Sequence, residues 1–244
     1  MRPPADPATR RRRSAGLFAA LLLCAGALLA FAELAGEVVA GETHAFDEAV
    51  LLAMRNPADL ADPIGPAWVE AAFRDITSLG GTTVLAAVTL ATLGYLLLAG
   101  KRTTALLVAV AVGGGTILSS ILKSGFERPR PDLVAHLVEV SSQSFPSGHA
   151  MLATVTWLTL GTLLATVQPT RRLKAYVLAV GIALALLVGT SRVYLGVHWP
   201  TDVLAGWCIG TAWALACWLV AGALVRRGAV PRSDRDGRRD GPAS

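Results

Sequence analysis

Six mostly apolar runs constrain this chain more than any other feature. A membrane hydrocarbon core of about 30 Å requires about 20 residues of helix. Runs close to that length cover residues 15–35, 79–99, 103–122, 149–167, 173–190 and 201–225. Only 16% of the 244 residues are charged and 53% are hydrophobic, which leaves few charges to cover the surface of a soluble domain. The sequence therefore predicts an all-α integral membrane protein, a bundle of six transmembrane helices.

The Lys and Arg residues indicate the orientation of these helices. Most of the 22 lie at the N-terminus, in the second and fourth connections and at the C-terminus, and the positive-inside rule assigns that face to the cytoplasm. We expect both termini inside and residues 36–78, 123–148 and 191–200 outside, in the plasma (inner) membrane. Because the basic residues are grouped beside apolar runs, the net charge of +5 does not indicate a nucleic-acid partner.

On this interpretation the chain has three parts. Residues 1–14 form a basic cytoplasmic N-terminus, residues 15–227 a six-span membrane domain with an extracytoplasmic insertion at residues 36–78, and residues 228–244 a disordered cytoplasmic tail. The first run also resembles a cleavable signal sequence, an alternative that leaves the later topology unchanged. Amphipathic spacing in the insertion predicts short helices at residues 47–54 and 67–76. They either lie on the outer surface or form a lid that shapes substrate entry.

The first of three charged clusters contains Lys123 and Arg130. Prolines on both sides of the arginine restrict its backbone, so two cations at the end of a span can face one oxyanion. A guanidinium binds phosphate in a bidentate manner, whereas an ammonium acts as a point charge. Lys123 can alternatively extend to the membrane interface with no role in binding. Arg128 is ambiguous between a further phosphate contact and an ion pair with Glu127, and it stays outside the predicted site.

The second cluster, Ser147-Gly148-His149, lies where an outer loop becomes the fourth span. Ser147 is a favourable N-cap and Gly148 permits close approach of the backbone. The free amides of a helix start attract an anion, and His149 could protonate a leaving oxygen as a general acid. The alternative is a histidine near a helix cap that is wetted by headgroup water.

The third cluster contains Arg192, His198 and Asp202 at the mouth of the sixth span. A neutral imidazole can attack phosphorus with one nitrogen while Asp202 holds the proton on the other, as in a nucleophile, base and orienter triad. Asp202 would also stabilise a positive phosphohistidine. The alternative is an aspartate that caps its helix beside an interfacial histidine.

Together the clusters resemble the three-part signature of the type 2 phosphatidic acid phosphatase, or lipid phosphate phosphatase, superfamily. The matching motifs are Lys123-x6-Arg130-Pro131, Pro146-Ser147-Gly148-His149 and Ser191-Arg192-x5-His198-x3-Asp202. The resemblance implies a metal-independent phosphatase without a cofactor, in which His198 becomes phosphorylated, Asp202 supports it and His149 protonates the leaving group. It implies a phosphate site formed by Lys123, Arg130, Ser147, Gly148 and Arg192.

A site at the outer membrane boundary indicates a lipid phosphate as substrate, with membrane lipids around it. The bacterial-looking architecture favours undecaprenyl pyrophosphate, and the alternatives are phosphatidic acid, phosphatidylglycerol phosphate and lipid A phosphate. Outside enzymes, the alternatives are a transporter or a lipid-binding protein. A transporter should carry charges near the bilayer midplane, whereas only Glu33 lies well inside a predicted span, close to its end. No Cys/His spacing resembles a zinc site.

Overall fold

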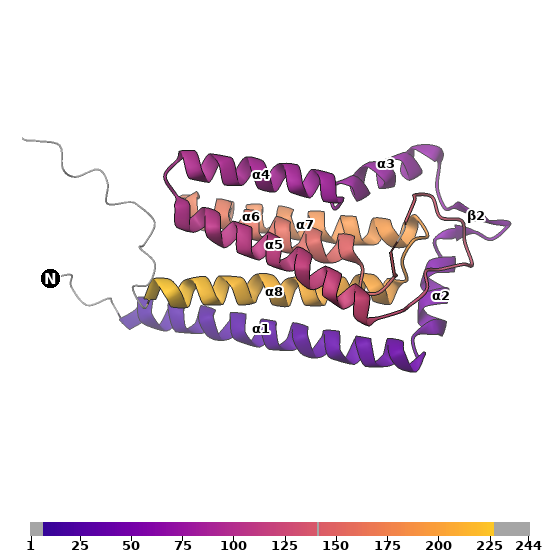
Figure 1. Ribbon diagram of the computed structural model, residues 1–244, viewed down its shortest axis with the longest axis horizontal. Coiled ribbons are helices and arrows are strands. Elements are labelled where there is room, and N and C mark those ends of the chain that lie inside the picture. Colours follow the sequence, from indigo (N-terminus) through magenta and orange to yellow (C-terminus); the bar gives the residue numbers. More distant parts are fainter. Residues whose placement is uncertain (1–6, 141, 227–244) are drawn as a thin grey trace, which may run out of the picture.

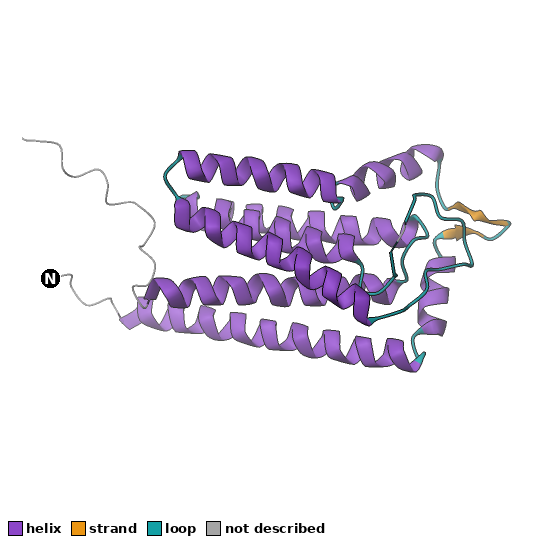
Figure 2. Cartoon of the chain, viewed as in Figure 1, coloured by secondary structure: helices purple, strands orange, loops and turns teal. Residues whose placement is uncertain are grey.

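The computed structural model describes residues 7–140 and 142–226, and long helices running side by side dominate this part of the chain (Figures 1 and 2). The long helices are α1 (Pro7–Ala40), α4 (Thr82–Leu98), α5 (Arg102–Gly125), α6 (Gly148–Val167), α7 (Arg171–Tyr194) and α8 (Pro200–Arg226). The insertion between α1 and α4 contains α2 (His44–Leu52), β1 (Arg55–Asn56), β2 (Asp59–Pro63) and α3 (Ala67–Ser78).

Among the described residues, five helices are long and apolar enough to cross a membrane, and α3 and α4 together pass the same test as a pair bent by 47°. Gly80 lies at this bend. A β-carbon at Gly80 would lie 2.3 Å from the Val188 side chain, so the glycine allows the bent pair to approach α7. The predicted six-span helical bundle is confirmed, with its second span broken where α3 meets α4.

Several boundaries differ from the prediction because apolar runs stop before the helices do. Helix α1 begins at Pro7, and α7 continues to Tyr194, so Ser191 and Arg192 lie in a helical turn and not in the following loop. The insertion also contains a small antiparallel pair of strands, which helix periodicity could not predict. The predicted tail at residues 228–244 lies outside the described residues.

Small residues allow α8 to pack closely on α6. A β-carbon at Gly206 would lie 2.7 Å from the carbonyl oxygen of Ser147, and one at Gly210 would lie 2.8 Å from that of Met151. Glycines four residues apart form the packing face of many membrane helix pairs. This contact fixes the start of α6 against the start of α8, and both helix starts belong to the predicted site.

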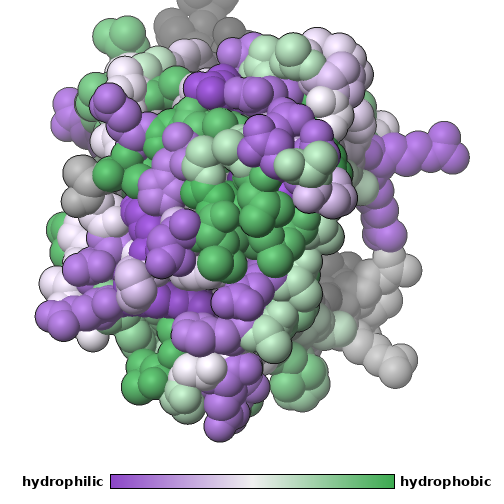
Figure 3. Space-filling view, turned by 90° about the vertical axis from the view of Figure 1, so that its right-hand side faces the viewer, coloured by the Kyte–Doolittle hydropathy of each residue, from purple (hydrophilic) through white to green (hydrophobic). Residues whose placement is uncertain are grey.

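The insertion covers one end of the bundle, and the start of α1 lies beside the C-terminal end of α8 at the other end (Figure 1). The loop between α5 and α6 (described at residues 126–140 and 142–147) and the turn between α7 and α8 also lie at the insertion end. Viewed from this end, apolar side chains form a patch among polar ones (Figure 3). Exposed apolar residues of the insertion include Leu60, Ile64 and Trp68.

Candidate active site

The predicted site residues come from four helices and two connections at the insertion end of the bundle. Lys123 lies in the last turn of α5 and Arg192 in the last turn of α7. Arg130 is on the loop between α5 and α6, and His198 is on the short turn that precedes α8. The other members lie at helix starts: Ser147, Gly148 and His149 at α6, and Asp202 at α8.

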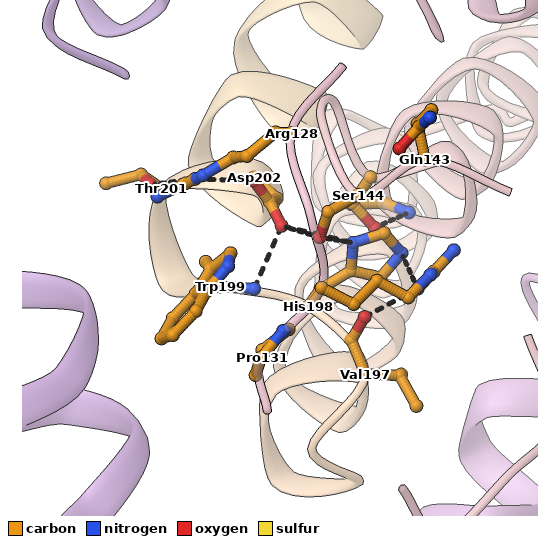
Figure 4. Close-up of polar contacts among 12 residues, drawn as sticks. Arg128, Pro131, Gln143, Ser144, Val197, His198, Trp199, Thr201 and Asp202 are labelled. Atoms are coloured by element: carbon orange, nitrogen blue, oxygen red, sulfur yellow. Dashed lines mark hydrogen bonds and ion pairs between the residues drawn. The ribbon is translucent and has the colours of Figure 1, made fainter. Parts of the chain in front are cut away.

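The ring of His198 is held between a carboxylate and a guanidinium. Its side chain is 2% exposed, and Nδ1 lies 3.3 Å from Oδ2 of Asp202. On the opposite edge, Nε2 lies 3.3 Å from Nη1 of Arg130 (Figure 4). With the proton on Nδ1 facing the carboxylate, Nε2 keeps its lone pair and faces the basic side of the site. Burial lowers the pKa of His198 to about 4, which keeps the imidazole neutral at physiological pH.

Asp202 is fully buried and accepts hydrogen bonds at both carboxylate oxygens. Oδ2 accepts from the backbone N–H of Trp199 at 2.9 Å and from the hydroxyl of Ser144 at 2.5 Å. Oδ1 accepts from Nη1 of Arg128 at 2.6 Å. The carboxylate therefore has one fixed orientation toward His198, and it caps its own helix as the alternative interpretation requires. The two roles share Oδ2, which accepts from the Trp199 N–H and faces Nδ1 of His198, while Oδ1 is left to Arg128.

Ser144 was missed by the sequence interpretation. It is fully buried, and its oxygen lies within 3.3 Å of His198 Nδ1 as well as donating to Asp202 (Figure 4). Its backbone N–H donates to the carbonyl of Arg128 at 3.1 Å. Serine has no charge and stands outside the recognised motifs, so nothing in the sequence distinguished it from the neighbouring Ser142.

Lys123 and Arg130 both bind the loop that separates them from α6. The Lys123 ammonium donates to the carbonyl of Gln143 at 2.7 Å, and Arg130 Nε donates to the carbonyl of Ser142 at 2.8 Å. A further Arg130 hydrogen bond, from Nη1 to the Val197 carbonyl at 2.5 Å, fixes the guanidinium beside His198. Burial lowers the pKa of Arg130. Lys123 is therefore anchored within the site, and does not simply extend to the interface.

Arg192 reaches the same region from α7 and is 3% exposed. Nη1 donates to the hydroxyl of Thr77 on α3 at 2.9 Å, whereas Nε is buried without a hydrogen-bond partner among the described residues. A buried donor without a partner costs roughly 1–3 kcal/mol. Such a donor is suited to an anionic ligand that arrives from outside the protein.

The start of α6 packs against the lysine and against α8. Ser147 caps the helix by accepting from the Ala150 N–H at 3.4 Å, as predicted, and its own N–H donates to the Asp202 carbonyl at 2.9 Å. Gly148 leaves the space that Lys123 occupies, since a β-carbon there would lie 3.2 Å from Lys123 Cε. His149 is half-buried and lies within electrostatic range of His198 and the site cations.

The contacts of Arg128 match neither of the two roles considered for it, a phosphate contact or an ion pair with Glu127. Its side chain is buried and forms ion pairs with Asp202 and with Asp47 of α2, at 2.6 and 2.5 Å. Arg128 forms no ion pair with the adjacent Glu127 among the described residues, and the carboxylates that pair with it are 81 and 74 positions away. Arg128 is thus bound to carboxylates and not directed at the phosphate site.

Charge is the feature that most limits what this site can bind. Lys123, Arg130 and Arg192 lie close enough to influence one another electrostatically. Among residues 7–140 and 142–226, none of the three has a carboxylate within ion-pair distance, because Asp202 is paired with Arg128 and His198. Uncompensated cations around a neutral imidazole suit a multiply charged anion such as a phosphate group.

The sequence matches the family model described as the PAP2 superfamily over residues 102–226. Phosphatidylglycerophosphatase B from Bacillus subtilis is 37% identical over 144 residues, which are 59% of this chain and 70% of that protein. An undecaprenyl-diphosphatase from Sulfolobus acidocaldarius is 44% identical over 68 residues, 28% of this chain and 29% of that protein. The crystal structure of a transmembrane PAP2-type phosphatidylglycerolphosphate phosphatase from Bacillus subtilis superimposes with a TM-score of 0.68 and 30% identity, covering 84% of this chain and 96% of the other.

Proposed function

Because the chain belongs to the PAP2 superfamily as a multi-pass membrane lipid phosphatase, we propose that it hydrolyses the phosphomonoester of a glycerophospholipid through a phosphohistidine at His198. The observation that carries this proposal is the arrangement around the ring of His198. Nδ1 faces a fixed carboxylate, and Nε2 faces a group of cations that form no ion pair with an acid in the part of the chain that the structure describes.

In the first step, Nε2 of His198 attacks phosphorus and the bond from phosphorus to the lipid oxygen breaks. Asp202 holds the Nδ1 proton and stabilises the positive charge of the phosphorylated ring. His149, which must carry a proton once the anionic phosphate is bound, gives that proton to the departing lipid oxygen, which leaves as an alcohol. Lys123, Arg130 and Arg192 neutralise the equatorial oxygens, and the Ser147 hydroxyl and the Gly148 N–H donate hydrogen bonds to them.

In the second step, a water molecule attacks phosphorus and the bond to Nε2 breaks. His149, now neutral, accepts a proton from this water, which restores its starting state. Inorganic phosphate leaves and His198 returns to the neutral imidazole. All proton transfers use residues of the site, and its three cations offset the phosphate charge, so the proposed reaction includes no metal ion.

Phosphatidylglycerol phosphate is the first candidate substrate. The relatives that share the longest stretches include a phosphatidylglycerophosphatase and a structure described as a phosphatidylglycerolphosphate phosphatase. Undecaprenyl pyrophosphate, which the sequence favoured, is the second candidate, supported by the shorter match to an undecaprenyl-diphosphatase. Both substrates present a terminal phosphate on a lipid. They differ in the part of the lipid that lies beyond the phosphate clamp, which is formed by Lys123, Arg130 and Arg192 with Ser147 and Gly148.

We also propose that the site faces the extracytoplasmic side of the plasma membrane, with both termini in the cytoplasm and the insertion outside. The distribution of basic residues supports this orientation. The site lies at the end of the bundle opposite the start of α1 and the C-terminal end of α8 (Figure 1). Labelling of a cysteine introduced at exposed Asp59 in intact cells, with an impermeant reagent, tests it, and protection of that cysteine would refute the orientation.

The decisive experiment measures phosphate release by purified protein across a panel of phosphatidylglycerol phosphate, phosphatidic acid, undecaprenyl pyrophosphate and lipid A phosphate. We expect the highest kcat/KM with phosphatidylglycerol phosphate and retention of activity in excess chelator. His198→Ala should release no phosphate and should form no acid-labile phosphoenzyme. Strict dependence on a divalent ion, or turnover by His198→Ala, would contradict the mechanism.

A further inference from the structure

We infer that Asp47 and Arg128 are positioning residues for the His198–Asp202 pair, so that helix α2 of the insertion forms part of the catalytic machinery. This inference rests on the proposed function and extends it to residues outside the three motifs. Neither residue contacts His198, and both act through Asp202.

Arg128 binds Asp202 and Asp47 with the two arms of one guanidinium. Nη1 donates to Asp202 Oδ1 at 2.6 Å and to the Thr201 hydroxyl at 2.8 Å. Nη2 donates to Asp47 Oδ2 at 2.5 Å and to the Thr43 hydroxyl at 3.1 Å. The guanidinium also lies over the ring of Trp199, 5.6 Å from its centroid. Four hydrogen bonds and an aromatic face leave the arginine one orientation.

Asp47 fixes the start of α8 from the opposite side. It is fully buried, and its Oδ1 accepts from the backbone N–H of Thr201 at 2.9 Å while Oδ2 accepts from the Thr201 hydroxyl at 2.7 Å. A carboxylate at a helix N-terminus satisfies free amides and interacts favourably with the helix dipole. Asp47 thus holds the turn of α8 that carries Asp202, across 154 positions of sequence.

The charges explain why both residues are needed. Arg128 alone would draw on the negative charge of Asp202, which His198 needs when it becomes a cationic phosphohistidine. Asp47 shares the arginine, so the three residues together keep one net negative charge beside His198. Buried ion pairs contribute little net stability compared with apolar residues of similar volume. A catalytic requirement for orientation and charge accounts for their presence better than stability does.

Arg128 has a second connection to the site through its backbone. Its carbonyl accepts from the N–H of Ser144 at 3.1 Å, and the Ser144 hydroxyl donates to Asp202 Oδ2. The side chain of Arg128 therefore orients one carboxylate oxygen, and its main chain positions the donor to the other. Displacement of Arg128 would affect both oxygens together.

The test compares Asp47→Asn with Glu70→Gln in purified protein. Glu70 forms the matched control pair, an ion pair with Arg74 at 2.6 Å on exposed α3 of the same insertion. Asp47→Asn should lower kcat by about 10- to 100-fold, since small misplacements of catalytic groups have effects of this size. KM and the inhibition constant of inorganic phosphate should change less than about 3-fold, because the phosphate clamp does not include Asp47. Glu70→Gln should match the wild type in all three quantities.

A double variant keeps the test decisive if the single variant folds poorly. Asp47→Asn with Arg128→Gln removes one negative and one positive buried charge together and restores one net negative charge, that of Asp202. It should lose kcat no more than Asp47→Asn alone, because residues that act as a unit are not additive. If wild type releases phosphate but Asp47→Asn and the double variant both keep wild-type kcat, or lose phosphate affinity in step with kcat, the inference is overturned. If the wild type releases no phosphate from any lipid in the panel, the proposed function fails and the inference fails with it.

Discussion

Replacement of Gly206 by alanine should disable the site from outside it. The new β-carbon would lie 2.7 Å from the Ser147 carbonyl oxygen and 3.0 Å from Ala150 Cβ, where ordinary contact begins at 3.4 Å. The obstructing oxygen is backbone and cannot rotate away, so α8 and α6 must separate by roughly 0.7 Å at this point. Overpacking of this kind costs about 1–3 kcal/mol, which exceeds the roughly 1 kcal/mol that alanine adds to helix propensity.

This separation occurs where the start of α6, with Ser147 to His149, packs against the start of α8, with Asp202. Ser147 donates its N–H to the carbonyl of Asp202, so a shift of α6 moves Ser147 and Gly148 away from His198. We expect a lower Tm in detergent and a kcat reduced by about 10- to 100-fold. Both are measured on the same preparation, by thermal unfolding and by phosphate release.

Two other glycines make the experiment specific. A β-carbon at Gly94 meets nothing within 4 Å, so Gly94→Ala should leave Tm and kcat near wild type. A β-carbon at Gly210 would lie 2.8 Å from the Met151 carbonyl, one turn farther from the site, so Gly210→Ala should lower Tm with a smaller effect on kcat. Wild-type kcat and Tm for Gly206→Ala, or an equal loss for Gly94→Ala, would refute the reasoning.

Three further predictions concern the chemistry. His149→Ala should reduce turnover by about 10² to 10⁴-fold with a poor leaving group and much less with a good one such as p-nitrophenol; an equal loss with both would argue against an acid role. Ser144→Ala removes a hydrogen bond to a buried carboxylate worth about 1.5–3 kcal/mol, and kcat should fall by roughly 10- to 100-fold, whereas Ser124→Ala on the exposed face of α5 should have no effect. Because burial lowers the pKa of His198 from 6.5 to about 4 and the neutral ring is the nucleophile, kcat/KM should decline through His198 protonation only as pH falls toward about 4. The second ionisation of the lipid phosphate is found separately by ³¹P NMR titration, and a decline of kcat/KM from enzyme protonation as pH falls through 6.5 would contradict the assignment.

The parts of the site that the sequence predicted are those with short fixed spacing. His198 and Asp202 are four residues apart at a helix start, so the helix itself brings them together. Lys123 and Arg130 were expected at one anion because a stiff loop leaves the end of a span, and both are bound to that loop. The spans could be predicted for the same reason, because each is a continuous apolar run of the length that a membrane helix requires.

The missing parts depend on contacts between distant segments. Arg128 was considered with its sequence neighbour, but its buried partners are 81 and 74 positions away. Asp47 looked like one of several acids on a surface helix, and its full burial depends on the docking of α2 against α8. The close approach of α6 and α8 did have a local signal, Gly206 and Gly210 four residues apart, which the assignment of spans by hydropathy passed over.

The docking of α2 on α8 also has a consequence for how the protein is made. Ribosomes deliver Asp47 in the first quarter of the chain, and the backbone amide that it binds at Thr201 follows 154 residues later. Thr77 on α3 is also synthesised before its partner, since Arg192 follows it by 115 residues. Catalytic competence is therefore acquired in one step, when the last span enters the membrane beside the first. On the proposed mechanism, nascent chains that stall earlier would carry Lys123, Arg130 and Arg192 without an oriented His198, and so would hydrolyse no lipid.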